Sequence, residues 1–158
     1  MYSVCMSILK NPAEAQEATQ DTFIKAHRAL ENYNADSKFS SWLYKIAYRT
    51  SLDYLRKRKS TSDIDQLNGS QIVSSENRQL SLDNKELSGL LSQAIAQLNE
   101  EEALIVRLFY LEELQISELE DITGLGKSNI KVKLFRARKK LADIIKSDYS
   151  ELQQFLIV

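Results

Sequence analysis

The sequence predicts an all-α protein built from two small helical domains. One Pro and four Gly among 158 residues indicate mostly helix, because both residues are disfavoured in helix interiors. Apolar residues recur at helical spacing in two blocks, and a stretch rich in Ser, Asn, Asp and Gln separates them. This stretch is too long for a loop inside a compact domain. The sequence therefore divides into a first domain at residues 1–59, a linker at 60–84, and a second domain with a C-terminal tail at 85–158.

The first domain is expected to contain two long helices. Asn11 and Pro12 form a typical helix start, as N-cap and first helical residue. The inner stripe of this helix comprises Ala15, Ala18, Thr19, Thr22, Phe23, Ala26 and Leu30. A second helix is predicted from Ser40, with a core face of Leu43, Ile46, Ala47, Thr50 and Tyr54.

The second domain is expected to contain four helices, at residues 84–98, 100–111, 116–123 and 127–146. Three acidic residues suit the start of the second of these helices. Gly124 is positioned to end the short third helix as a C-cap. A short helix, a glycine turn and a basic helix form the helix-turn-helix pattern.

The charges are concentrated in blocks, although the net charge is only -1. Residues 38–59 carry seven Lys or Arg against one acid, and residues 127–146 carry eight against one. Residues 60–126, by contrast, carry three basic residues against thirteen acidic ones. Two dense basic blocks in one small chain favour a polyanionic partner.

The last basic helix has an inner and an outer face. At 100° per residue, Ile130, Leu134, Ala137 and Leu141 share the core side. Val132, Phe135, Arg136 and Lys139 lie opposite, Lys131 and Lys133 lie on the flanks, and Ser128 and Asn129 begin the helix. Cations with apolar side chains on one face suit a helix in a DNA major groove. An amphipathic helix that docks on a protein or a membrane surface is the alternative interpretation.

The first basic block interleaves aromatic residues with cations, a pattern that suits single-stranded nucleic acid. Trp42, Tyr44, Tyr48 and Tyr54 alternate with Lys38, Lys45, Arg49 and the run Arg56–Lys59. Tyr54 lies on the core stripe, and a core role for Trp42 stays open. Tyr44 and Tyr48 lie away from that stripe and are expected to be available for binding.

Nothing in the sequence indicates an enzyme. His27 is the only histidine and Cys5 the only cysteine, so neither a zinc site nor a disulfide is expected. No phosphate-binding loop is present, and we expect no cofactor, no metal and no small-molecule substrate. Without a long apolar run or a signal peptide, the expected location is the cytoplasm, without membrane insertion.

Three segments together resemble the bacterial sigma-70 family, and within it the extracytoplasmic-function (ECF) group. They are QDTFIKAHRALENY, then FSSWLYKIAYRTSLDYLRKRK, then LSQAIAQLNEEEALIVRLFYLEELQISELEDITGLGKSNIKVKLFRARKKL. WLYKIA before a basic helix end, with KLFRARKKL downstream, is a specific combination. The resemblance implies a sigma region 2 bundle and a sigma region 4 helix-turn-helix domain, joined by a flexible linker.

The resemblance also implies function: a promoter-specificity subunit that binds core RNA polymerase and promoter DNA, and that an anti-sigma protein commonly restrains. It implies three sets of residues. Glu17, Gln20, Asp21 and Phe23 would contact core polymerase. Lys38, Trp42, Lys45, Tyr48, Arg49 and Arg56 would contact the minus-ten element. Ser128, Asn129, Lys131, Val132, Lys133, Phe135, Arg136 and Lys139 would contact the minus-thirty-five element.

The sequence departs from the family pattern in three ways. The opening helix is expected to be missing or incomplete, since members usually have about twenty more residues there. Arg49 replaces a frequent asparagine, and Val132 replaces a frequent serine of the recognition helix, so promoter preference should differ. Two alternative functions stay open: a stand-alone helix-turn-helix regulator, and a sigma-like adaptor that does not initiate transcription.

Overall fold

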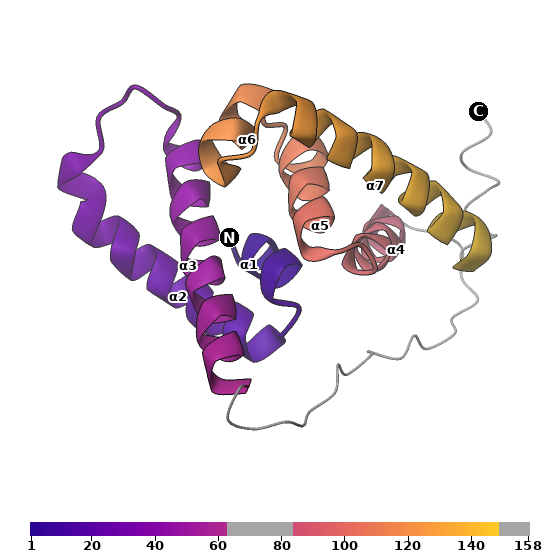
Figure 1. The fold of residues 1–158 in the computed structure, drawn as a ribbon, viewed down its shortest axis with the longest axis horizontal. Coiled ribbons are helices and arrows are strands. Elements are labelled where there is room, and N and C mark those ends of the chain that lie inside the picture. Colours follow the sequence, from indigo (N-terminus) through magenta and orange to yellow (C-terminus); the bar gives the residue numbers. More distant parts are fainter. Residues whose placement is uncertain (63–83, 149–158) are drawn as a thin grey trace.

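The computed structural model describes residues 1–62 and 84–148, where every regular element is helical, as predicted. The N-terminal domain comprises α1 (Tyr2–Leu9), α2 (Pro12–Ala29), η1 (Leu30–Asn32) and α3 (Phe39–Ser62). The C-terminal domain comprises α4 (Asn84–Ala96), α5 (Glu100–Val106), η2 (Arg107–Leu111), α6 (Ile116–Thr123) and α7 (Lys127–Asp148), as Figure 1 shows. Most of the predicted linker and the C-terminal tail lie outside the described residues.

The predicted helix boundaries are confirmed where the sequence holds capping residues. The Asn11 side chain accepts hydrogen bonds from the backbone N–H groups of Ala13 and Glu14, at 3.0 and 3.2 Å. Gly124 ends α6 in the left-handed region, with φ 74°, and its N–H donates to the carbonyl of Glu120. Both ends follow from local chemistry, because an Asn side chain replaces a missing acceptor and glycine adopts positive φ without strain.

The buried face of α2 consists of small residues. Ala15, Ala18, Thr22 and Ala26 are buried, and small side chains let α1 and α3 pack closely against this helix. The prediction that Phe23 and Leu30 belong to this stripe is wrong, since they are 52% and 49% exposed. Phe23 lies about 80° around the helix from Ala15, at the edge of the stripe, and Leu30 falls in η1, after α2 has ended.

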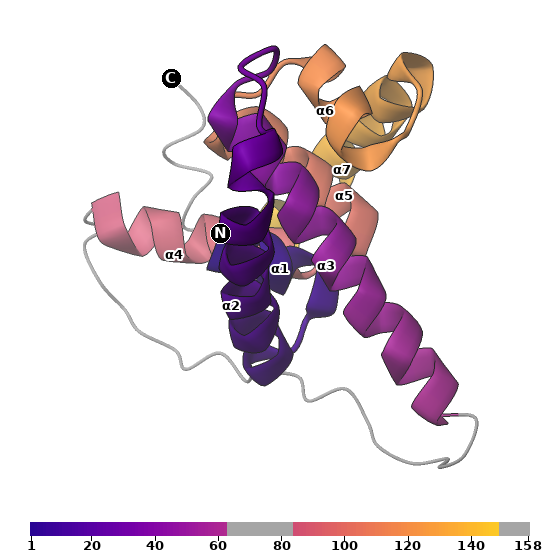
Figure 2. The ribbon, with the colours of Figure 1, turned by 90° about the vertical axis from the view of Figure 1, so that its left-hand side faces the viewer.

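The helix α1, at the position where the opening helix was expected to be missing or incomplete, spans eight residues and connects the two domains. It packs against α2 and α3 on one side and against α5 on the other, as Figures 1 and 2 both show. Its residues Val4, Cys5, Ile8 and Leu9 are at most 3% exposed. They belong to the same apolar cluster as residues of the C-terminal domain, among them Ile95, Leu98, Leu104 and Leu108. The two domains therefore share one core.

The core face of α7 matches the prediction. Ile130, Leu134 and Ala137 are buried, and Leu141 packs against the same cluster while remaining partly exposed. Through this face α7 packs on α4, α5 and α6. The opposite face is thereby turned outward.

We predict that Ile8→Ala lowers the free energy of unfolding by about 2–5 kcal/mol, because it leaves a cavity in the shared core. The matched control is Ile24→Ala, at a position that is 49% exposed, which should change stability by less than about 0.5 kcal/mol. Urea denaturation followed by circular dichroism measures both. Equal effects of the two substitutions would contradict the buried, shared position of α1.

Candidate nucleic-acid interface

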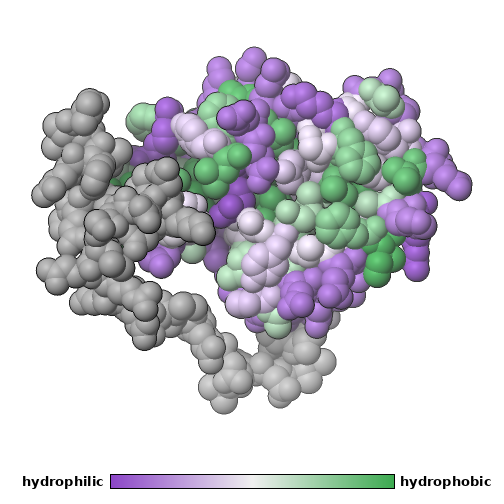
Figure 3. All heavy atoms as spheres, turned by 180° about the vertical axis from the view of Figure 1, so that it is seen from behind, coloured by the Kyte–Doolittle hydropathy of each residue, from purple (hydrophilic) through white to green (hydrophobic). Residues whose placement is uncertain are grey.

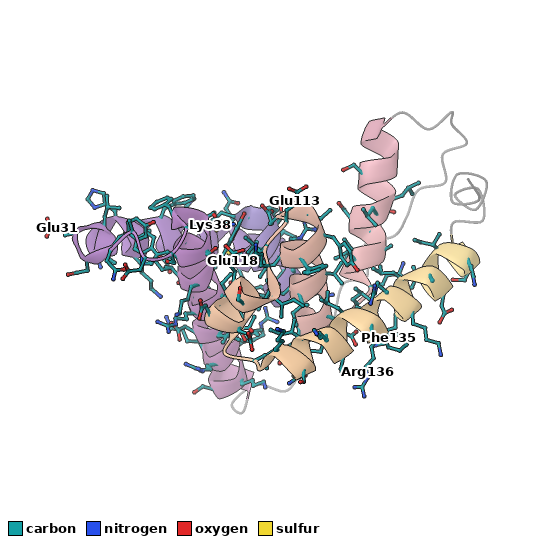
Figure 4. The ribbon with its side chains drawn as sticks, turned by 90° about the horizontal axis from the view of Figure 1, so that it is seen from above. Glu31, Lys38, Glu113, Glu118, Phe135 and Arg136 are labelled. Carbon is teal, nitrogen blue, oxygen red and sulfur yellow. The ribbon has the colours of Figure 1, made fainter. Side chains whose placement is uncertain are left out.

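The outward face of α7 carries both cations and apolar groups. Phe135 is 65% exposed and Val132 is 45% exposed. Figure 4 shows Phe135 and Arg136 projecting away from the body of the protein. Ser128, Asn129, Lys131, Arg136 and Lys139 are exposed as well. Within the described part of the chain, no ion pair involves Lys131, Arg136 or Lys139, so the charges of these side chains are not neutralised by neighbouring carboxylates. Such charges suit contact with the phosphates of a DNA groove.

Two other lysines of α7 are held by the acidic start of α5. Lys133 Nζ lies 2.5 Å from Glu101 Oε2, and the Lys133 side chain is only 22% exposed. Lys140 Nζ lies 2.7 Å from Oε2 of Glu102, whose side chain is 6% exposed. These pairs orient α7 on the C-terminal domain. The pair with Glu101 also holds Lys133 against α5, so Lys133 is less exposed than the other predicted DNA contacts of α7.

The turn before α7 is fixed by hydrogen bonds. The backbone N–H of Lys127 donates to Oε1 of Glu120 at 2.6 Å, and the N–H of Leu125 donates to Oγ1 of Thr123 at 3.2 Å. The N–H of Ile130 donates to the carbonyl of Gly126. The first turn of α7, with Ser128 and Asn129, is thus held in one orientation relative to α6.

Three aromatic rings meet at the start of α3. The Tyr33 ring centroid lies 5.1 Å from that of Trp42 and 5.5 Å from that of Phe39. Tyr33 also donates from its hydroxyl to the carbonyl of Ser37 at 2.6 Å, which closes the loop between η1 and α3. Sequence reasoning missed Tyr33 and Phe39; their positions on either side of this loop, close to Trp42, were the available signal. The half-buried Trp42 is therefore part of an aromatic cluster at the domain surface.

The cations near this cluster differ in their surroundings. Arg49 is exposed, Lys45 is half-buried, and Arg56 lies 3.3 Å from Asp53 on the same helix. Lys38 lies 3.3 Å from Glu118 of α6, in the other domain. The structure thus brings the predicted minus-ten residues onto one helix and its preceding loop, but part of this surface faces the C-terminal domain.

Tyr44 and Tyr48 do not have the accessibility expected from their positions on α3. Tyr44 is buried, and its hydroxyl donates to Oε2 of Glu112. Burial is the main cause that raises the pKa of Tyr44 above its usual range, and the hydrogen bond to Glu112 raises this pKa further. Tyr48 packs on the shared core. Burial raises the pKa of Tyr48, and the negative charge of Glu101 raises it further. The physical reason is that the C-terminal domain covers this side of α3.

The predicted polymerase-binding residues lie on α2. Glu17, Gln20 and Phe23 are exposed, whereas Asp21 is half-buried and accepts a hydrogen bond from the Tyr54 hydroxyl at 2.9 Å. The apolar side chains Phe23, Ile24 and Leu30 are exposed on α2 and η1. Figure 3 shows apolar side chains among polar ones on the surface of this side of the molecule. An apolar group beside acidic residues has the composition of a protein-docking surface.

Other kinds of site find no support in the described residues. They contain no group of three or more His, Cys, Asp or Glu side chains that could hold a metal ion. None of their helices combines the length and apolar character needed to cross a membrane.

Comparison with known proteins identifies the class that this arrangement defines. Residues 1–61 match the family model for Sigma-70 region 2, and residues 88–141 match the model for Sigma-70, region 4. The chain is 31% identical over 153 residues to the ECF RNA polymerase sigma factor SigW of Bacillus subtilis (strain 168), covering 89% of this chain and 80% of SigW. It is 31% identical over 145 residues to SigM of the same organism, covering 89% of this chain and 85% of SigM.

A solved structure supports the fold. The sigma factor RpoE of Bartonella quintana, crystallised with the anti-sigma factor NepR, superposes with a TM-score of 0.75 at 22% identity, covering 93% of this chain and 90% of that one. With the sequence matches, the conclusion is plain: the chain belongs to the ECF group of sigma-70 family RNA polymerase sigma factors. Such a protein is the promoter-specificity subunit that directs transcription initiation.

We predict that Tyr54→Phe removes one ionisation from the alkaline titration of the protein, close to pH 12. Burial and then the hydrogen bond to Asp21 raise the pKa of Tyr54 to about 12, compared with about 10 for an unperturbed tyrosine. Because the folded-state pKa is raised, the stabilisation is complete below about pH 10 and is lost as the pH rises toward 12. Tyrosinate absorbance measures the ionisation. If Tyr54→Phe removed an ionisation near pH 10 and not near pH 12, Tyr54 would not have the buried, hydrogen-bonded environment described.

Proposed function

We propose that this chain recognises a promoter through two separate surfaces and binds core polymerase through a third. The observation that carries the proposal is the outward face of α7, where exposed cations flank the exposed Phe135 and Val132. In a major groove, Lys131, Arg136 and Lys139 would contact phosphates of the minus-thirty-five element. Val132 and Phe135 would contact thymine methyl groups or sugars, and Ser128 and Asn129 would reach base edges.

The second surface is the aromatic cluster at the start of α3, with its adjacent cations. Trp42 with Tyr33 and Phe39 supplies ring faces for unpaired bases of the minus-ten element. Lys38, Lys45, Arg49 and Arg56 supply charge along the strand, and Tyr48 would become accessible when the domains separate. This division assigns single-stranded DNA to the N-terminal domain and duplex DNA to the C-terminal domain.

The third surface is the exposed side of α2. Glu17 and Gln20 provide polar contacts to core polymerase, and Phe23 provides an apolar anchor. Asp21 contributes from its hydrogen bond with Tyr54, which fixes its carboxylate against α3. Aromatic residues such as phenylalanine are enriched in the cores of protein interfaces.

The chain acts in the cytoplasm as a non-catalytic subunit, and the polymerase performs the chemistry. An anti-sigma protein is a further partner, in keeping with the complex of the similar RpoE with NepR.

Run-off transcription with purified core polymerase and fragments of the source genome tests the function directly. The chain should direct initiation from specific start sites that core polymerase alone does not use. If no template gives product above core polymerase alone, initiation is not the function of this chain.

We predict that the double substitution Arg136→Glu and Lys139→Glu lowers affinity for the minus-thirty-five duplex by at least about tenfold, because two phosphate contacts become repulsive. Association with core polymerase should be unchanged, since α2 carries that contact. Lys146→Glu, an exposed charge reversal near the end of α7, is the control and should leave specific DNA binding within about twofold. Fluorescence anisotropy and co-purification measure the two properties; loss of both with the double substitution would contradict a DNA-specific role.

A further inference from the structure

Among the described residues, polar contacts of four side chains join the two domains around the shared core. Lys10 donates from Nζ to the backbone carbonyls at the end of α4. Arg107 donates from Nε to Oγ of Ser7 at 3.0 Å, and Tyr44 donates to Glu112. The fourth contact is made by Glu118, which reaches from α6 to the start of α3. Only this fourth contact engages a residue predicted to bind minus-ten DNA.

The Glu118 carboxylate is held by donors from the start of α3, from the loop before it and from the start of its own helix. Its Oε1 accepts a hydrogen bond from Oγ of Ser41 at 2.9 Å and lies 3.3 Å from Nζ of Lys38. Its Oε2 accepts the backbone N–H of Gln115 at 2.8 Å. Ser41 is only 6% exposed, whereas the Lys38 side chain is 65% exposed. The hydrogen bond from Gln115, together with those from Ser41 and Lys38, lowers the pKa of Glu118 despite its burial.

This site lies beside the proposed base-stacking surface. Ser41 and Lys38 are within four residues of Trp42 along the chain, and Figure 4 shows Lys38 and Glu118 next to each other where the two domains meet. A serine hydroxyl with a lysine ammonium is the donor set that proteins use for DNA phosphates as well as for carboxylates. A strand whose base stacks on Trp42 would place its backbone close to these donors.

We propose that Glu118 stands in for a DNA phosphate: in this conformation its carboxylate fills the Ser41–Lys38 site, which takes a backbone phosphate of the single-stranded minus-ten element when the domains separate. The inference rests on the proposed function of the α3 surface. Carboxylate and phosphate need the same donors, so the contact between the domains and binding of the minus-ten strand exclude each other. The outward face of α7 stays open in the same conformation, so duplex binding is not blocked.

Binding of a labelled single-stranded DNA 20-mer of mixed sequence to the full chain, at low salt and without polymerase, tests the inference. Glu118→Gln keeps the capping hydrogen bond with Gln115 but weakens the hold on Lys38. Asp121→Asn is the matched control, because it removes one negative charge from an exposed position of the same helix. Glu118→Gln should bind the oligonucleotide about fivefold more tightly than Asp121→Asn, the effect expected of a partly exposed ion pair.

Two further readouts locate the gain. Trp42 is the only tryptophan, so its fluorescence should be quenched by the oligonucleotide more strongly in Glu118→Gln than in the control. Adding Lys38→Gln to Glu118→Gln should abolish the gain in affinity for the oligonucleotide, because it removes the cation that would bind the phosphate. Affinity for duplex DNA should be the same in Glu118→Gln and Asp121→Asn.

A charge-conserving variant guards against misfolding and against a general charge effect. Glu118→Asp keeps the negative charge, but its side chain is too short to reach Ser41 from the same backbone position, and it should also gain affinity for the oligonucleotide. Equal affinities of Glu118→Gln, Glu118→Asp and Asp121→Asn would overturn the inference. Run-off transcription by the unaltered chain is independent of this result, so the proposed function can stand while the inference fails.

Discussion

The packing of α1 between the two domains is the constraint on which the rest of the structure depends. Its residues Val4, Cys5, Ile8 and Leu9 are almost completely buried and share one cluster with the apolar side chains of α4 and α5. Separation of the domains would expose this surface to water, at a cost that grows with the apolar area. A partner that opens the chain must therefore supply binding energy of its own. Core polymerase, which we propose to bind the exposed side of α2, is suited to that role.

The polar contacts around this core determine which surfaces of the two domains are covered and which stay accessible. Non-directional apolar burial sets how strongly the domains adhere, whereas hydrogen bonds with defined partners set which surfaces face each other. Tyr44 and Lys38 face Glu112 and Glu118, so the proposed minus-ten surface on the N-terminal domain is partly covered. Because α7 uses its inner face for the core, its outer face is not involved in this contact. Of the two proposed DNA surfaces, the outer face of α7 is thus accessible in this conformation, and the surface on α3 is partly covered.

The sequence predicted the features that depend on local chemistry. The Asn11 cap, the Gly124 turn and the core stripe of α7 follow from residues a few positions apart, and the structure has them as expected. Contacts between the domains depend on residues as far apart in the sequence as Ser41 and Glu118, and no local sequence pattern predicts such contacts. Tyr44 illustrates the difference. Its place away from the core stripe of α3 indicated exposure, but in the structure the C-terminal domain buries it. The left-handed Lys10 after α1 and the π-helical η2 before Glu112 were also beyond local reasoning.

A distance between the two domains shows whether they share a core in the free chain and separate on the polymerase. Spin labels at Arg28→Cys on α2 and Arg138→Cys on α7, both exposed positions, would report it by double electron–electron resonance; Cys5 is buried. One narrow distance distribution is expected for the free chain, and a longer distance is expected after core polymerase is added. A broad distribution in the free chain, unchanged by polymerase, would contradict it.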